Sequence, residues 1–303
     1  MKEKARAMVL ASFAADALAL GAHWIYDISA IDRKFGRVER FIKPLENSYH
    51  DGKALGEFTH YGDQALCLLE SVSACSGFES SDFAHRWKGL FSDYSGYFDQ
   101  ATKATLRNFE SGSDPSASGS ISSDLGGASR ISPLVYRYHQ DFDKLIAYAE
   151  AQTRMTHNNP QVSESAAFFA ALAARVLEGN SPSQGINHIL KEGRVDAPLT
   201  GWISEGQEST RMETREAISG FGQMCDTAAA FPSVIHLILK YETDLKTALM
   251  ENVMSGGDSA ARGLMAGMIL GAHLGLEAIP QEWLSELKQS RHIDGLLETM
   301  GMD

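Results

Sequence analysis

The chain has 303 residues, of which 44% are hydrophobic and 22% charged, a composition typical of a folded globular protein rather than a disordered one. Its formal net charge of -12, without a stripe of Lys or Arg, repels polyanions, so we expect no nucleic-acid partner. The three cysteines form no CxxC pair, which argues against a disulfide framework and predicts a reducing, cytoplasmic compartment.

Apolar residues recur at helical spacing along the chain, and no run alternates as a half-buried strand would. The pattern predicts helices near residues 4–24, 63–76, 81–109, 141–155, 163–178, 182–192, 225–240, 244–253, 258–275 and 281–289. Because no linker-like segment divides the sequence, we interpret residues 1–303 as a single all-α domain. The uncharged segment 263–276 is shorter than the roughly 20 residues that span a bilayer, so we expect no membrane association.

Two segments depart from this pattern. Residues 110–132 are rich in Ser and Gly and are predicted to form no regular structure, and so long a loop in a compact domain is usually functional or disordered. In the helix after Asp258 a glycine recurs every fourth residue, each costing about 1 kcal/mol relative to alanine. Since another helix backbone can approach such a face closely, we expect one to pack on Gly263, Gly267, Gly271 and Gly275.

Two aspartates follow small residues at predicted helix starts. Asp63 comes after Gly62, and Asp258 comes after Gly256 and Gly257. Each can accept a hydrogen bond from a free backbone N–H of its helix and complement the helix dipole. Capping alone indicates no function, so the interpretation depends on the surrounding residues.

Five segments, of which the second contains Asp63 and the last contains Asp258, occur in this order along the chain: DALALGAHWIYD, HYGDQALCLLES, SDLGGASRISPL, QTRMTHNN and VMSGGDSAARGLMAGMILGAHLG. Together they resemble the ADP-ribosylglycohydrolase family, in the branch that is similar to the lens J-crystallins. The resemblance implies a single orthogonal bundle of helices with its site in a cleft among helix starts. Members with the full motif set hold two magnesium or manganese ions there.

The two metal motifs of the family are depleted in this chain. The family's Thr-Asp-Asp falls on residues 62–64 and its Asp-x-Asp-Thr on residues 258–261, where only Asp63 and Asp258 match. Hard divalent ions prefer six or so oxygen ligands, so we do not expect a full dinuclear centre. The resemblance still allows one magnesium or manganese ion held by Asp63, Asp258 and water.

Other polar residues are candidates for the same cleft. Asp16 lies on an apolar helical stripe, and we favour a structural hydrogen bond to a neighbouring helix over metal ligation. Asp27 follows HWIY, near an acidic position of the family, so the resemblance makes Asp27 and Asp63 the candidate catalytic carboxylates. His60 is a candidate replacement for a lost acidic ligand, while His23 can also face the cleft.

For substrate binding, the resemblance implies a tight loop whose N–H groups face a diphosphate, formed by Gly126, Gly127, Ala128, Ser129 and Arg130. Leu125 stands where the family has Asn, and Ser129 where it has a bulky residue, which puts the phosphate contacts in doubt. His157 in THNN resembles the family histidine that contacts the ligand, although a cap or surface role is an equal alternative.

The resemblance therefore predicts a hydrolase that cleaves an N- or O-glycosidic bond of an ADP-ribosyl or related nucleotide, with or without a metal ion. Its partner would be a small molecule or an ADP-ribosylated substrate. The alternative is a non-catalytic, metal-poor member that binds a nucleotide or serves as a stable crystallin-like protein. Metal binding and release of ADP-ribose distinguish the two.

Overall fold

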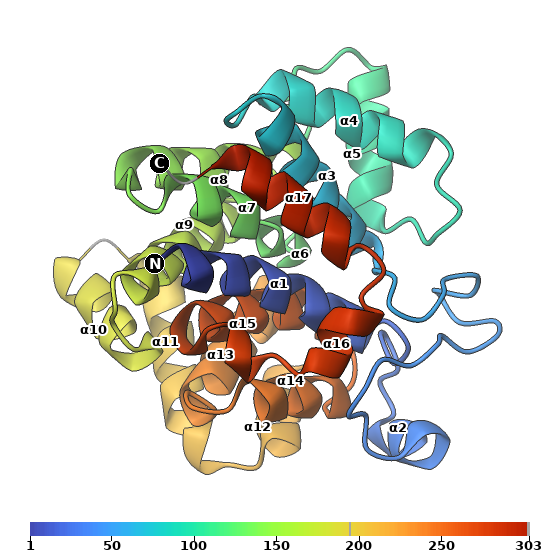
Figure 1. The fold of residues 1–303 in the computed structure, drawn as a ribbon, viewed down its shortest axis with the longest axis vertical. Coiled ribbons are helices and arrows are strands. Elements are labelled where there is room, and N and C mark those ends of the chain that lie inside the picture. The colour runs from blue at the N-terminus through green and yellow to red at the C-terminus, as the bar shows by residue number, and fades with distance from the viewer. Residues whose placement is uncertain (194, 302–303) are drawn as a thin grey trace.

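The computed structural model describes residues 1–193 and 195–301. Within these ranges the chain forms helices and two isolated β-bridges but no strand, which confirms the all-α prediction (Figure 1). The helices are α1 (Lys2–Ala19), α2 (Ile28–Phe35), α3 (His60–Ala74), α4 (Ser80–Ser92), α5 (Gln100–Glu110), α6 (Gly126–Ser129), α7 (Ser132–Tyr138), α8 (Phe142–Thr156), α9 (Pro160–Leu177), α10 (Pro182–Glu192), α11 (Ala197–Glu208), η1 (Ser209–Arg211), α12 (Thr214–Phe221), α13 (Thr227–Lys240), α14 (Leu245–Met254), α15 (Ser259–Leu274), η2 (Leu276–Ala278), α16 (Gln281–Glu286) and α17 (Ser290–Met300).

Helices α1 and α15 lie side by side at the centre of the molecule and make its most extensive helix–helix contact (Figure 1). A Cβ atom on Gly267 would lie 2.5 Å from the Ala11 carbonyl oxygen, and one on Gly271 would lie 2.6 Å from the Ala11 Cβ. The glycine face therefore lets two backbones approach closely, as expected. Gly275 differs, because it ends the helix at a φ of 84° with open space around it.

The other helices surround this central pair. Helices α9, α13 and α14 pack against α15, and α3, α7 and α17 pack against α1. The buried apolar side chains form a continuous cluster that runs from Ala5 to Met300. Division into one domain remains our interpretation of this arrangement. No helix in the described ranges is both long and apolar enough to cross a membrane.

The predicted helix 81–109 is interrupted. Helix α4 ends at Ser92, and α5 begins only after Asp99, whose carboxylate caps it by accepting a hydrogen bond from the Thr102 N–H at 2.5 Å. The intervening residues 93–99 contain Gly96 and a capping aspartate, both of which favour a turn over a continuous helix. This break carries two tyrosines and an aspartate toward the candidate site.

The segment 110–132 is not structureless, in contrast to the prediction. Residues Gly126–Ser129 form the short helix α6, and two β-bridges join Ser120 to His157 and Asp124 to Asp226. Other helices that the periodicity missed are short or interrupted by glycine, and they are α2, α7, α11, α12 and α17. Long-range contacts, rather than local pattern, order these parts of the chain.

Candidate functional site

Asp258 stands at the end of a tightly held loop. Gly256 and Gly257 precede it at φ values of 70° and 66°, a region that favours glycine. The Asp258 N–H donates to the Gln223 carbonyl oxygen at 2.8 Å, and its carboxylate accepts from the Ala261 N–H at 3.2 Å. Asp258 is thus the N-cap of α15, as predicted, and its side chain is held in a fixed place.

Two side chains bind the carboxylate of Asp258, which is fully buried. The His23 Nε2 atom lies 3.1 Å from one oxygen, and the Tyr61 hydroxyl donates to the other at 2.9 Å. Burial opposes ionisation, but His23, Arg262 and the Ala261 amide outweigh it and lower the pKa of Asp258. Burial also lowers the pKa of His23, so this histidine is neutral and donates through Nε2.

His23 is itself oriented by a second histidine. The His23 Nδ1 atom lies 2.7 Å from His50 Nε2, and burial lowers the pKa of His50 to about 2. With both rings neutral, His50 donates to His23 and His23 donates to Asp258. His50 was not predicted as a site residue, because it lies in an irregular segment between α2 and α3 that has no helical periodicity.

Asp124 is the second carboxyl group of the site. It lies just before α6, its carboxyl group is 2.8 Å from the Tyr61 hydroxyl oxygen, and it accepts a hydrogen bond from the Gly126 N–H at 2.7 Å. Burial and the negative charge of Asp258 raise the pKa of Asp124 to about 7. Tyr61 therefore touches both carboxyl groups. Because a phenol has one proton to donate, both contacts are satisfied when Asp124 carries a proton of its own.

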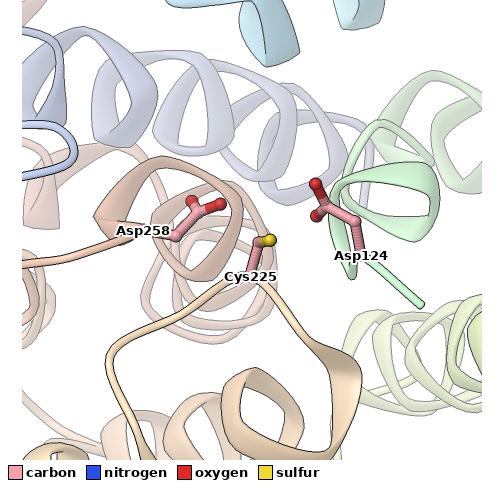
Figure 2. A group of neighbouring side chains, drawn as sticks. All are labelled: Asp124, Cys225 and Asp258. Carbon is pink, nitrogen blue, oxygen red and sulfur yellow. The ribbon is translucent and has the colours of Figure 1, made fainter. Parts of the chain in front are cut away.

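Cys225 completes the group (Figure 2). Its sulfur and one oxygen each of Asp124 and Asp258 all lie within 4.8 Å of one another. Burial and the two carboxylates raise the pKa of Cys225 well above its usual value, so the thiol is protonated at neutral pH. Asp124 and Cys225 also line a cavity of about 260 Å³, whose other walls include Trp24, Tyr49 and Tyr97.

Asp63 lies in different surroundings. Helix α3 begins three residues earlier than predicted and is capped by Thr59, so Asp63 falls in the first turn and is not the N-cap. Its carboxylate accepts hydrogen bonds from Lys53 Nζ and from the Tyr94 hydroxyl, both at 2.5 Å. Burial raises the pKa of Asp63, and the Lys53 charge partly offsets this rise. Asp63 lines a separate cavity of about 340 Å³ with Cys67, among other residues.

Asp16 has the structural role that we favoured. Its two oxygens accept from the Thr59 N–H at 2.8 Å and the Thr59 hydroxyl at 2.6 Å, which fixes the start of α3. Burial raises the pKa of Asp16 to about 7. A Cβ on Gly62 would lie 2.4 Å from an Asp16 oxygen. Gly62, at the first position of the first metal motif, therefore leaves space for the Asp16 carboxyl group.

Asp27, the other predicted catalytic carboxylate, is exposed. It precedes α2, its side chain is 61% accessible, and it forms an ion pair with Arg33 at 3.2 Å. Asp27 is not among the residues that line the cavity at Asp124. His60, proposed as a substitute ligand, is buried with its Nε2 atom 2.8 Å from Asp99. Burial opposes the charge on His60, but Asp99 outweighs it and raises the pKa.

The glycine-rich turn is a buried helical turn rather than an open loop. Gly126 and Gly127 donate to Asp124, and Ala128 and Ser129 donate to the Leu125 carbonyl oxygen. These N–H groups donate hydrogen bonds within the turn, whereas the resemblance predicted that they face a diphosphate. All four residues of the turn are buried. Their role in substrate binding remains a prediction without support from these contacts.

Arg130 and His157 are also enclosed. The Arg130 guanidinium donates to Gln152 at 2.7 Å, to Gln64 at 2.9 Å and to the Thr156 hydroxyl. His157 Nδ1 lies 2.9 Å from the Thr156 hydroxyl, and burial lowers the pKa of His157 to about 3. Its ring packs where a Cβ on Gly127 would otherwise lie. Both side chains therefore brace α6 from within the core, and their ligand contacts remain predictions.

A two-ion site does not fit these residues. Gln64, the third position of the first motif, uses its carbonyl oxygen for Arg130 and for the Trp87 indole. Asp63 is held by Lys53, and Ala260 and Ala261 offer no ligand atom. Near Asp258, by contrast, carboxylate oxygens of Asp124 and Asp258 and the Cys225 sulfur lie within 4.8 Å of one another, and they would offer a single divalent ion three donors once Asp124 and the thiol had lost their protons. Asp124 and Cys225 thus join Asp258 in a donor set that the sequence did not indicate.

Sequence comparison relates the chain to a known protein family. The ADP-ribosylglycohydrolase family model matches residues 1–302. Crystallin J1A of Tripedalia cystophora is 24% identical, with 96% of this chain and 94% of that protein covered. ADP-ribosylhydrolase ARH3 of Homo sapiens is 23% identical, with 87% and 84% covered.

Among solved structures, one titled ADP-ribosylglycohydrolase-related protein complex superposes with a TM-score of 0.78. It is 20% identical and covers 99% of this chain, with 97% of that chain covered in return. The structural match supports the all-helical fold, and the family model covers nearly every residue. This chain belongs to the ADP-ribosylglycohydrolase family.

Proposed function

We propose that the protein hydrolyses a glycosidic bond of an ADP-ribosyl or related nucleotide substrate, with Asp124 as the carboxyl group that meets the substrate. One observation carries this proposal: Tyr61 joins two buried carboxyl groups, and one of them lines an open cavity. Glycoside hydrolysis uses a protonated acid and an ionised partner, which two carboxyl groups in unequal surroundings can supply. Family membership supports this class of bond.

In this proposal Asp124 donates its proton to the leaving nitrogen or oxygen as the bond to the anomeric carbon breaks. Water then adds to that carbon and returns a proton to Asp124, so the enzyme is restored and the net reaction is hydrolysis. Asp258 is fully buried and acts through Tyr61 as a positioning residue. The hydrogen bond from His23 fixes the orientation of the Asp258 carboxylate.

A divalent ion would be held by Asp258, Asp124 and Cys225. Bound there, it would supply Lewis acidity to water or to a ribose hydroxyl. Asp63 is not counted among these ligands, because its carboxylate is already paired with the positive Lys53 ammonium.

A second candidate function is a stable, non-catalytic protein of crystallin type. The observation in its favour is that the chain has few metal-ligating side chains at the motif positions. The side chains of Ala260 and Ala261 have no donor atoms, and the Asp63 carboxylate is paired with the Lys53 ammonium. The similarity to Crystallin J1A adds support. Such a protein would keep the fold without turnover.

Release of ADP-ribose from ADP-ribosylated arginine and serine peptides tests the proposal, measured with magnesium, with manganese and with a chelator. We expect turnover by the wild type and a loss of about 10²–10⁴-fold in kcat for Asp124→Asn. Asp244→Asn is the matched control, because this exposed N-cap of α14 lies outside the site and asparagine caps as well.

Two further variants test the carboxylates expected from the resemblance. If Asp27→Asn or Asp63→Asn lowered kcat as far as Asp124→Asn, the proton-donating role would move to that residue. Absence of turnover under all metal conditions, from a protein that unfolds cooperatively, would favour the crystallin-like candidate.

A further inference from the structure

A groove lies among helices α8, α9, α10 and α11, separate from the cavity at Asp124. Helices α8, α10 and α11 each pack against α9, and the residues between them enclose a volume of about 280 Å³. None of the residues that line this groove lines the cavity at Asp124. We call it the α9 groove, and its ligand would be distinct from the substrate of the proposed hydrolysis.

The walls of the α9 groove are mainly apolar. They include Phe142, Ile146, Phe168, Ala171, Ile189 and Leu199. On α8, Phe142 and Ile146 are four residues apart and therefore share one face of the helix. Both side chains are only half-buried, although they pack against the hydrophobic core. The groove thus leaves apolar surface that a ligand can remove from water.

The polar side chains of the α9 groove are acidic. Among the described residues that line it, the polar side chains are those of Glu150, Glu164, Glu192 and Asp196. Two of them already have a cation, because Arg154 lies 2.5 Å from the Glu150 carboxylate and Arg175 lies 2.6 Å from that of Glu192. The uncompensated charge of the groove therefore comes from the other two.

Glu164 and Asp196 lie close together without a cation. No described lysine, arginine or histidine forms an ion pair with either carboxyl group. Asp196 is the N-cap of α11, yet its side chain accepts no hydrogen bond from the first turn of that helix. Burial and the negative charge of Asp196 raise the pKa of Glu164. Two like charges thus meet at the rim of an apolar groove, and a cation placed there would relieve their repulsion.

From these observations we propose that the α9 groove binds an amphiphilic amine, a small molecule that carries an ammonium group on an apolar chain or ring. The ammonium group donates hydrogen bonds to Glu164 and Asp196, and the apolar part covers Phe142, Ile146 and Phe168. Charge-assisted hydrogen bonds hold the head of the ligand, and removal of apolar surface from water holds its tail.

Other classes of ligand suit the α9 groove less well. An anion would meet only carboxyl groups among the described polar side chains that line it. A neutral apolar molecule would leave Glu164 and Asp196 without a cation. A divalent ion prefers about six oxygen ligands and would leave the apolar walls in contact with water. The volume is slightly below the range of about 300–1,000 Å³ that is usual for drug-sized ligands, which favours a compact amine.

Titration calorimetry on the full chain tests this inference with five probes: hexylammonium, the neutral hexan-1-ol, the anionic hexanoate, the tailless methylammonium and magnesium. We expect hexylammonium to bind saturably with a Kd of about 1 mM or below, because burial of about five methylene groups suffices for that affinity. The other four probes should bind at least about tenfold more weakly, since each lacks the positive charge or the apolar tail.

Variants separate the head of the ligand from its tail. Glu164→Gln combined with Asp196→Asn should weaken hexylammonium binding at least about tenfold and change hexan-1-ol binding by less than about twofold. Glu216→Gln combined with Glu282→Gln is the matched control, because it removes the same charge at exposed positions outside the groove. Ala167→Leu places a larger side chain in the groove and should weaken both probes at least about fivefold. Unfolding curves establish that each variant is folded.

Alanine methyl NMR signals of the wild type locate the ligand without any variant. Ala167 and Ala171 line the α9 groove, whereas Ala101 lines the cavity at Asp124. Hexylammonium should shift the first two signals and leave that of Ala101 unchanged.

Four results would each overturn the inference. They are the absence of saturable hexylammonium binding, equal or tighter binding of another probe, a shift of Ala101 without Ala167 and Ala171, and unchanged affinity in the folded double variant or in folded Ala167→Leu. Because the two cavities share no lining residue, the outcome is independent of whether the protein hydrolyses ADP-ribosylated peptides.

Discussion

The ion pair between Lys53 and Asp63 changes what the Asp63 carboxylate can bind. The resemblance predicts a metal ligand at Asp63, yet its oxygen accepts from the Lys53 ammonium at 2.5 Å. Both side chains are mostly buried, at 16% and 17% accessibility, so the ammonium neutralises the carboxylate in place. Asp258, in contrast, is stabilised by neutral donors and by the more distant Arg262.

Removal of this lysine should therefore uncover a metal ligand. We expect Lys53→Met to lower the free energy of unfolding by roughly 1–3 kcal/mol, because the Asp63 carboxylate loses its cation in a partly buried site. Added manganese or magnesium should recover part of that loss, measured as a rise in Tm.

Lys53→Arg is the control, since it keeps the charge and should respond to metal no more than the wild type does. An equal rise in Tm for the wild type and Lys53→Met would contradict the idea that the ammonium stands in the place of an ion.

At the scale of elements, the contact between α1 and α15 fixes where Asp258 is presented. The glycine face lets the two backbones meet, with the Ala11 carbonyl oxygen 2.5 Å from where a Gly267 Cβ would lie. Asp258 caps the first turn of this same helix, so the packing of α15 and the position of the carboxylate are linked.

Gly267→Ala should accordingly destabilise the protein by about 1–3 kcal/mol, because the clash outweighs the gain of about 1 kcal/mol in helix propensity. Urea unfolding measures the change. Gly295→Ala in α17 is the matched control: it is exposed and a Cβ there would meet nothing within 4 Å. That variant should be unchanged or slightly more stable, and equal losses in both would argue against the close contact.

At the scale of the whole molecule, buried histidines couple stability to pH. His236 is fully buried between the hydroxyls of Ser209 and Thr214, at 2.8 and 3.0 Å. Burial lowers its pKa to about 4, below the value of 6.5 expected in the unfolded chain. Its contribution to stability is therefore complete above pH 6.5 and is lost as the pH falls toward 4, because the unfolded state then binds the extra proton.

The size of this effect is about 3 kcal/mol over that interval, since each pKa unit corresponds to about 1.4 kcal/mol. Urea unfolding of the wild type and His236→Gln at several pH values isolates it. The variant should lose less stability on acidification, whatever its stability at pH 8. Parallel curves for the two proteins between pH 6.5 and 4 would show that His236 does not titrate as expected.

Sequence patterns predicted well wherever the determining contacts are local. The long periodic helices, the glycine face of α15 and the capping role of Asp258 were all predicted, because each depends on residues within a few positions. The interruption at residues 93–99 was missed although Gly96 and the capping Asp99 are local turn signals. The ordered segment around α6 was missed because bridges to distant residues, Ser120 to His157 and Asp124 to Asp226, hold it in place.

The sequence by itself determined the all-α class and the presentation of Asp258 at a helix start, because helical periodicity and capping are properties of neighbouring residues. The family followed from the resemblance of five ordered segments. Only the tertiary structure decided which groups meet it. Tyr61 reaches Asp258 across 197 positions and Asp124 across 63, and Lys53 rather than a second ligand meets Asp63. Such contacts depend on how helices pack against one another, which no local pattern encodes.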